Sequence, residues 1–133
     1  MFSNLKFNRM VIVMEQCFSG GLIHDVARSG NRIIISAASE YEPSWCMTGG
    51  TYNEFSYYFT SAINKADPSG TKVDADTNKD GDVSLVEAFN YARSKDSKSE
   101  TPYYEDSGDG IPHSGAMPGG GEGTLGGSVT LEP

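Results

Sequence analysis

The residue of this sequence best suited to covalent chemistry is Cys17. It follows a short apolar run, Met10–Met14, and leads directly into residues 18–21, Phe-Ser-Gly-Gly. In open α/β sheets, catalytic groups collect outside the carboxyl ends of the strands. A cysteine that served only as a core hydrophobe would lie inside the apolar run rather than beyond Glu15 and Gln16. The position favours a nucleophile; an inert thiol, a redox role and metal binding are the alternatives.

A cysteine nucleophile needs a thiolate, a base and hydrogen-bond donors for the oxyanion. The turn can supply the donors, because the amide of Cys17 can point at a bound carbonyl while Gly20 and Gly21 let the chain pass close to it. A helix beginning near Leu22 would bring its positive end to the sulfur and favour the thiolate. A disulfide between Cys17 and Cys46 would block this chemistry, and two cysteines are too few for a disulfide framework.

A second group of residues has the spacing of a calcium ligand set. Residues 76–87 match the EF-hand pattern at every position, with Gly81 at the sharp turn and Glu87 as the closing bidentate ligand. Starting the loop at Asp74 would put Lys79 at the glycine position, so the register is fixed. Hard oxygen ligands without His or Cys indicate Ca²⁺. The predicted ligands are Asp76, Asn78, Asp80, Asp82, Ser84 and Glu87.

A capping box explains part of this loop more simply, because Ser84 and Glu87 have the spacing of a helix start. It accounts for only those two ligands. Pro68 and Gly70 lie just upstream and argue against a regular entering helix. We therefore expect a single structural loop of modest affinity, suited to calcium-rich surroundings outside the cytosol.

The elements that must position these residues follow from the apolar pattern. Met10–Met14 and Arg32–Ala37 are short and rich in Val and Ile, which predicts two strands. Leu22–Arg28 has room for about two helical turns between them, so we predict a parallel βαβ unit. Two apolar stripes predict core-facing helices rather than a cofactor pocket: Tyr52, Phe55, Phe59, Ala62 and Ile63, ending before Asp67, and Leu85, Ala88, Phe89 and Ala92.

Length and charge restrict the class of protein. A chain of 133 residues can build one domain with a real core but not two ordinary domains. The net charge of -8 argues against nucleic acid as a partner. No apolar run is long enough to cross a bilayer, and no signal peptide is evident, so a membrane partner is not expected either.

Three segments resemble the legumain branch of the caspase-like cysteine peptidases. Those enzymes place the nucleophile after a strand in a Glu-x-Cys-x-Ser-Gly context, and a second strand then ends in small residues and a Glu/Ser segment. The corresponding residues are 11–21, 33–39 and 42–44. The resemblance runs from residue 10 to residue 66. It implies an α/β fold that is part of a caspase-like domain, with a mostly parallel sheet flanked by helices and an EF-hand-like loop inserted.

The same resemblance implies a calcium-stabilised cysteine endopeptidase acting on peptides or proteins, with Cys17 as the nucleophile. It also implies a specificity pocket walled by Glu15, Ser44 and, less directly, Glu54. Two carboxylates would favour Arg or Lys at P1 through charge-assisted hydrogen bonds. Asn, the usual legumain choice, would need a balancing cation from elsewhere in the fold. Glu54 has an alternative interpretation as a solvated helix residue.

The catalytic histidine of that family is not evident. It belongs in a His-Gly motif on a strand before the cysteine strand, and no His precedes Met10. We expect His24 to face solvent and His113 to lie in irregular structure. The base is therefore expected from an upstream segment or a partner chain, with this chain as the C-terminal part of a longer peptidase. The alternative is a non-catalytic calcium-binding scaffold or binding domain derived from such a peptidase.

The C-terminal segment is first acidic and then rich in glycine. We divide the chain into residues 1–105, the C-terminal part of the peptidase domain, and residues 106–133, a tail that is either an ordered loop or disordered. Asp106–Gly110 with Glu105 could form a second acidic site, but it lacks a closing bidentate ligand at the right spacing, so turns are favoured. Calcium binding and the family resemblance together imply an extracellular or periplasmic location.

Overall fold

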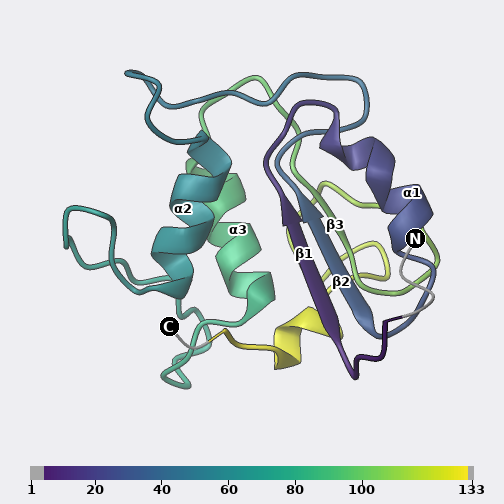
Figure 1. The fold of residues 1–133 in the computed structure, drawn as a ribbon. Coiled ribbons are helices and arrows are strands. Elements are labelled where there is room, and N and C mark those ends of the chain that lie inside the picture. Colours follow the sequence, from purple (N-terminus) through teal and green to yellow (C-terminus); the bar gives the residue numbers. More distant parts are fainter. Residues whose placement is uncertain (1–4, 132–133) are drawn as a thin grey trace.

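A three-stranded sheet lies between helices on both of its faces (Figure 1). The computed structural model describes residues 5–131. The strands lie in the order β1 (Met10–Met14), β2 (Arg32–Ser36) and β3 (Tyr103–Glu105). β1 and β2 are parallel, as predicted, whereas β3 is antiparallel to β2 and was not predicted. The helical elements are η1 (Ser19–Leu22), α1 (Ile23–Val26), α2 (Glu54–Ile63), α3 (Leu85–Lys95) and η2 (Gly126–Ser128).

β2 is buried on both faces, which explains why its sequence is continuously apolar. Ile33 and Ile35 belong to the core shared with α2 and α3, whereas Ile34 packs with Ile23 and Val26 of α1. In Figure 1, α2 and α3 lie on one side of the sheet and α1 on the other. The result is a three-layer α/β arrangement, compatible with part of a caspase-like domain.

The helix after β1 is shorter than the range predicted. Of Leu22–Arg28, only Ile23–Val26 is α-helical, and it follows directly from the 3₁₀ turn of η1. The chain must then turn back through Ser29 to enter β2, where the amide of Arg32 donates to the carbonyl of Ser29 at 3.2 Å. A longer helix would overshoot the start of β2.

Both predicted apolar stripes form helices that pack against the sheet. All four predicted core residues of α3 are buried, and the ring of Phe89 contacts those of Phe55 and Tyr104. The one error is Tyr52, which was assigned to the helical stripe but precedes α2 and is exposed. α2 begins after Tyr52 because the side chain of Asn53 caps it, accepting a hydrogen bond from the amide of Ser56.

The glycine-rich C-terminal segment lies against the rest of the fold. Met117 and Val129 are buried in the core that contains α2 and α3. His113 forms a β-bridge with Tyr104, so the segment also covers the outer side of β3. These contacts place residues on both sides of the proposed division at residue 105 in one hydrophobic core.

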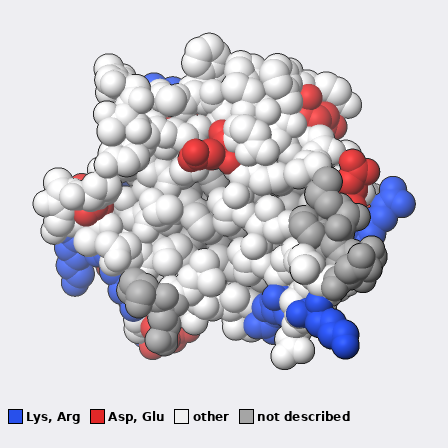
Figure 2. Space-filling model, in the orientation of Figure 1, with Lys and Arg blue, Asp and Glu red and all other residues white. Residues whose placement is uncertain are grey.

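Within the described residues, the opposite edge of the sheet, formed by β1, has no further strand paired with it. β1 pairs with β2, and Val13 is 39% exposed. Figure 2 shows few charged side chains on the face of the molecule that carries β1 and α2. An uncovered strand edge with apolar side chains is suited to pairing with a further strand. None of the helices in residues 5–131 is long and apolar enough to cross a membrane.

The packing of the C-terminal segment can be tested with two truncations of similar chemistry. Val129→Ala should lower the free energy of unfolding by about 2 kcal/mol, because it removes buried methyl groups. Leu131→Ala is the control, since Leu131 is exposed, and it should change stability by less than about 0.5 kcal/mol. Urea denaturation measures both values, and equal small effects would mean that the segment does not contribute to the core.

Candidate active site

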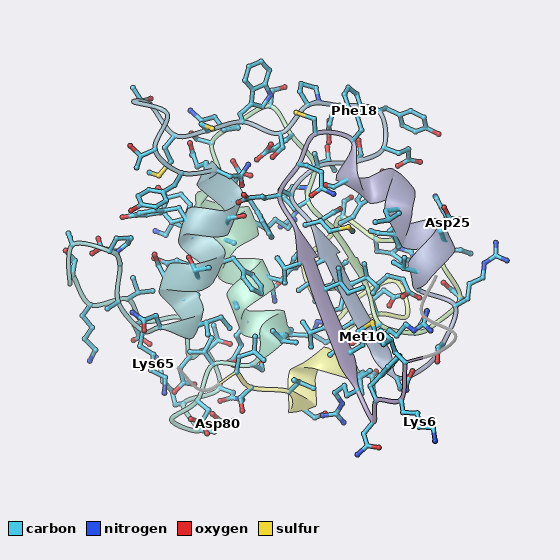
Figure 3. The ribbon with its side chains drawn as sticks, viewed as in Figure 1. Lys6, Met10, Phe18, Asp25, Lys65 and Asp80 are labelled. Carbon is cyan, nitrogen blue, oxygen red and sulfur yellow. The ribbon has the colours of Figure 1, made fainter. Side chains whose placement is uncertain are left out.

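Cys17 lies in the turn between β1 and η1, at the carboxyl end of the parallel strands. Its thiol is exposed, and its sulfur accepts a hydrogen bond from the amide of Ser44 at 3.4 Å and lies 3.6 Å from the carbonyl oxygen of Ser44. The next residue, Phe18, has a left-handed backbone with φ of 59° and a largely exposed ring at the tip of the turn (Figure 3). The turn therefore presents the thiol at the surface while the backbone of Ser44 holds it in place.

The turn that carries Cys17 is fastened to the turn that follows β2. The amide of Gly20 donates to the carbonyl of Ala38 at 3.0 Å, and the amide of Phe18 donates to the carbonyl of Glu42 at 2.9 Å. A Cβ atom at position 20 would lie 2.9 Å from backbone atoms of Ser39 and Glu40. Glycine at position 20 is therefore required by the close approach of the two chains.

Glu42 links the same turn to the segment between α3 and β3. Its carboxylate accepts hydrogen bonds from the amide of Ser39 at 3.0 Å and from the amide of Thr101 at 2.6 Å. Burial works against the charged form, but these hydrogen bonds outweigh it and lower the pKa of Glu42. The charge of Glu42 is thus used to hold the loop rather than offered to a ligand.

Asn53 joins three segments of the site and was not identified from the sequence as a site residue. Its side-chain amide donates to the hydroxyl of Ser44 at 2.6 Å and reaches the carbonyl of Glu15 at 3.4 Å. Its side-chain oxygen caps α2 at the same time. The only available sequence signal was that Asn is a common helix cap and that Asn53 stands two residues before Phe55, although the predicted stripe began at Tyr52.

Glu15 lines a cleft that lies next to the hydrogen bonds made by Asn53. The cleft has a volume of about 350 Å³, and its wall combines one carboxylate with aromatic and hydroxyl side chains. Its lining residues include Glu15, Tyr52, Asn53, Ser56, Tyr57 and Thr60. Because Asn53 bonds to both Ser44 and the backbone of Glu15, the cleft adjoins the thiol turn. The structure thus brings Cys17, Ser44 and Glu15 together.

Glu54 is directed elsewhere. It is only 5% exposed, which rules out the interpretation as a solvated helix residue. Its carboxylate accepts hydrogen bonds from the amide and hydroxyl of Ser97 and forms a salt bridge of 3.2 Å with Lys98. Burial opposes ionisation, but these two partners lower the pKa of Glu54 overall. Its described contacts therefore fix the start of α2 to the segment after α3.

Sequence reasoning missed a pair of acidic residues, Asp96 and Glu100, next to the loop that carries Ser44 and Trp45. Glu100 accepts a hydrogen bond from the amide of Trp45 at 2.8 Å, and its carboxyl faces that of Asp96. Burial, together with the proximity of Asp96, raises the pKa of Glu100 to about 7. The residues are far from Trp45 in the sequence, so no local pattern could reveal the contact.

Residues 96–101, which we call the connector, bind all three of Glu42, Trp45 and Glu54. The connector supplies Ser97 and Lys98 to Glu54, Glu100 to Trp45, and Thr101 to Glu42. It forms the support behind the loop that carries Ser44.

The two histidines of the chain have other partners. His24 is exposed, as expected, and its Nδ1 also lies 2.8 Å from the carbonyl oxygen of Gly110. His113 lies beside β3, where its backbone pairs with that of Tyr104. Neither histidine contacts Cys17 within residues 5–131. Both Cys17 and Cys46 are free thiols, so the disulfide alternative is not adopted.

The predicted calcium loop has a backbone suited to a cation. Gly81 has a φ of 99°, a conformation that favours glycine, and its amide donates to the carboxylate of Asp76 at 3.0 Å. The side-chain oxygens of Asn78 and Asp80 each accept a hydrogen bond from the amide two residues further on. Figure 3 shows Asp80 at the opposite end of the molecule from Phe18, so the loop does not touch the thiol turn.

Glu87 forms the capping box that was the simpler alternative. One oxygen accepts from the amide and hydroxyl of Ser84, and the other accepts from Thr77 and Asn78. Burial opposes ionisation, but these hydrogen bonds lower the pKa of Glu87 to about 2. The donor set fits Ca²⁺ in chemistry and backbone shape, provided that Glu87 exchanges its bonds to Thr77 and Asn78 for the ion.

Comparison with known proteins identifies one family. The model of the peptidase C13 family matches residues 1–110, which include the whole of the Cys17 site and the connector. No curated protein and no solved structure matches the chain. Most of the glycine-rich segment lies beyond the matched range.

The close approach at Gly20 predicts a sharp steric effect. Gly20→Ala should lower the free energy of unfolding by about 1–3 kcal/mol, because the backbone of Ser39 and Glu40 must move to admit the methyl group. Gly127→Ala is the matched control, since a Cβ there has nothing within 4 Å. Urea denaturation compares the two variants, and equal stabilities would contradict the described packing of the thiol turn.

The raised pKa of Glu100 predicts a stability that depends on pH. The folded chain keeps a proton on Glu100 that the unfolded chain releases near its ordinary pKa of 4.5. The contribution to stability is therefore present at low pH and is lost as the pH rises toward about 7. Glu100→Gln should flatten this decline, as measured by urea midpoints across that range. The exposed Asp25→Asn variant is the control, and an unchanged slope in Glu100→Gln would refute the assignment.

Proposed function

We propose that the chain forms the nucleophile-bearing part of a cysteine endopeptidase, because it belongs to the peptidase C13 family, which is the legumain family. The family membership supports a cysteine peptidase of the legumain type acting on proteins. The observation that carries the proposal for this chain is the exposed Cys17 thiol, held by the backbone of Ser44 at the carboxyl end of two parallel strands.

In this proposal the Cys17 thiolate attacks the carbonyl carbon of the scissile peptide bond. The carbonyl oxygen becomes an oxyanion, the amine leaves with a proton from the base, and water then hydrolyses the thioester. The amide of Phe18 is already bonded to Glu42, whereas the amide of Cys17 donates no hydrogen bond within the described residues. The Cys17 amide is therefore the donor that we assign to the oxyanion.

The base must come from outside the described site. His24 and His113 are bonded to the C-terminal segment and to β3, and neither contacts Cys17. We propose that an upstream segment or a partner chain supplies the histidine. The open edge of β1 offers the place where a further strand could pair and bring that histidine to the thiol.

The cleft beside Glu15 supports a preference for Arg or Lys at P1. Glu15 is exposed and lines the cleft, so its carboxylate can form a charge-assisted hydrogen bond with a basic side chain. Glu54, the second carboxylate predicted for the pocket, is paired with Lys98 and supports α2 instead. Asn at P1 is the alternative, because one carboxylate requires less charge compensation than two.

Calcium would stabilise the far end of the domain rather than take part in the reaction. Residues Asp76, Asn78, Asp80, Asp82, Ser84 and Glu87 would hold the ion, which would supply positive charge to join the loop to the start of α3. Such a loop suits an extracellular or periplasmic protein, where calcium is abundant, and we propose that location.

A second function is favoured by the position of the histidines. Since neither of them contacts Cys17, the chain could instead be a binding or scaffold domain with a thiol of ordinary reactivity. This alternative predicts no peptide cleavage and equal alkylation rates for Cys17 and Cys46, which are both exposed.

Two cysteine variants distinguish the two functions. Each is made in the whole protein, in the form that its own cells produce. Cys17→Ala should abolish cleavage of fluorogenic peptides, while Cys46→Ala should retain it, because only Cys17 lies at the end of β1. Peptides with Arg, Lys, Asn and Glu at P1 test the pocket, and Arg or Lys should be cleaved fastest.

Covalent labelling provides a readout that does not require turnover. A peptidyl electrophile with Arg at P1 should modify Cys17 and not Cys46, as located by peptide mass mapping. Cleavage that persists in Cys17→Ala would refute the nucleophile assignment. Equal labelling of both thiols without any cleavage would establish the scaffold alternative.

A further inference from the structure

Three carboxylates, two from β3 and the turn after it and one from the glycine-rich segment, meet beside β3, away from the thiol turn and from the loop at residues 76–87. One oxygen each of Glu105, Asp109 and Glu122 lie within 4.8 Å of one another. Among the described residues this is the only group of three or more acidic, His or Cys side chains gathered so closely. Glu105 ends β3, Asp109 follows in the next turn, and Glu122 comes from the glycine-rich segment.

The two glutamates are buried completely or almost so, with exposures of 0% for Glu105 and 2% for Glu122. Each uses one oxygen to bind backbone amides. Glu105 accepts from the amides of Gly108 at 2.7 Å and Gly110 at 3.1 Å, and Glu122 accepts from those of Asp106 at 2.6 Å and Ser107 at 2.9 Å. These bonds fix the orientation of both carboxylates.

The second oxygen of each glutamate is buried without a partner. Oε2 of Glu105 and Oε1 of Glu122 make no hydrogen bond within the described residues. Burying a carboxylate oxygen without a partner costs free energy, and two such oxygens near a third carboxylate also repel one another. A cation between the carboxylates would give both oxygens a partner and offset their repulsion.

We propose that Glu105, Asp109 and Glu122 form a calcium site that is separate from the loop at residues 76–87. The donors are oxygens without His or Cys, which selects a hard cation. Ca²⁺ accepts carboxylates in flexible geometry and completes its shell with carbonyl oxygens or water, whereas Mg²⁺ demands a regular octahedron. Asp109 is exposed, so the cation can enter from solvent on that side.

A calcium ion bound at this site would hold the glycine-rich segment against the rest of the domain. Glu122 already reaches back to the amides of Asp106 and Ser107, and a shared ion would add a charged link from Glu122 to β3 through Glu105. In Figure 1 this part of the chain runs beside β2 and β3. The carbonyl of Gly110 lies 2.8 Å from His24 Nδ1, so the ordered turn would also support α1.

The test is a calcium titration of the full chain after removal of bound metal with a chelator. Calorimetry gives the number of ions bound, and thermal denaturation gives the stabilisation by Ca²⁺ alone. Glu122→Gln and Asp109→Asn should each weaken one class of site at least tenfold. Without calcium, Glu122→Gln should melt at a higher temperature than the original chain, because it removes one of the mutually repelling charges.

The controls separate this site from the other one. Asp25→Asn removes an exposed carboxylate elsewhere and should leave binding unchanged, whereas Asp80→Asn should affect only the loop at residues 76–87. Asp109 is exposed, so Asp109→Asn decides the matter even if Glu122→Gln does not fold. Calcium binding by Asp109→Asn equal to that of Asp25→Asn would overturn the proposal. Equal affinity for Mg²⁺ would overturn the assignment to Ca²⁺.

Discussion

The candidate site depends above all on the parallel pairing of β1 with β2. Because Met14 lies opposite Ser36, the turn after each strand begins at the same level of the sheet. The turns then lie side by side, and the hydrogen bonds from Gly20 to Ala38 and from Phe18 to Glu42 join them. The contact between Cys17 and Ser44 depends on this register. The register is fixed because a shift of β1 by one residue would move its buried side chains to the opposite face of the sheet.

Local sequence patterns were sufficient to predict the strands and helices whose apolar residues recur at regular spacing. The two parallel strands, the cores of α2 and α3, and the family resemblance carried by the Cys17 segment were all confirmed. The residues that sequence reasoning missed act through long-range contacts. Glu100 meets Trp45, and Glu122 meets Asp106, across segments that no periodicity connects. β3 was missed because three residues of strand are too few to show a pattern.

Two acidic residues near the thiol turn serve the structure rather than a ligand. Glu42 and Glu54 each accept hydrogen bonds from backbone amides in other parts of the site, and their pKa values are lowered as a result. Glu105 and Glu122 differ because each leaves one buried oxygen without a partner. Counting carboxylates in a sequence therefore overestimates the number available for binding, and the hydrogen bonds of each oxygen decide which ones remain.

The connector at residues 96–101 has a consequence for how related chains can diverge. It contacts the loop that carries Ser44 through Thr101 and Glu100, and it contacts the start of α2 through Ser97 and Lys98. A change of side chain in the connector would therefore shift the cleft wall without altering any residue that lines the cleft. Homologues should consequently vary in these two regions in a correlated way, and the shape of the cleft can change through substitutions on a segment that does not line it.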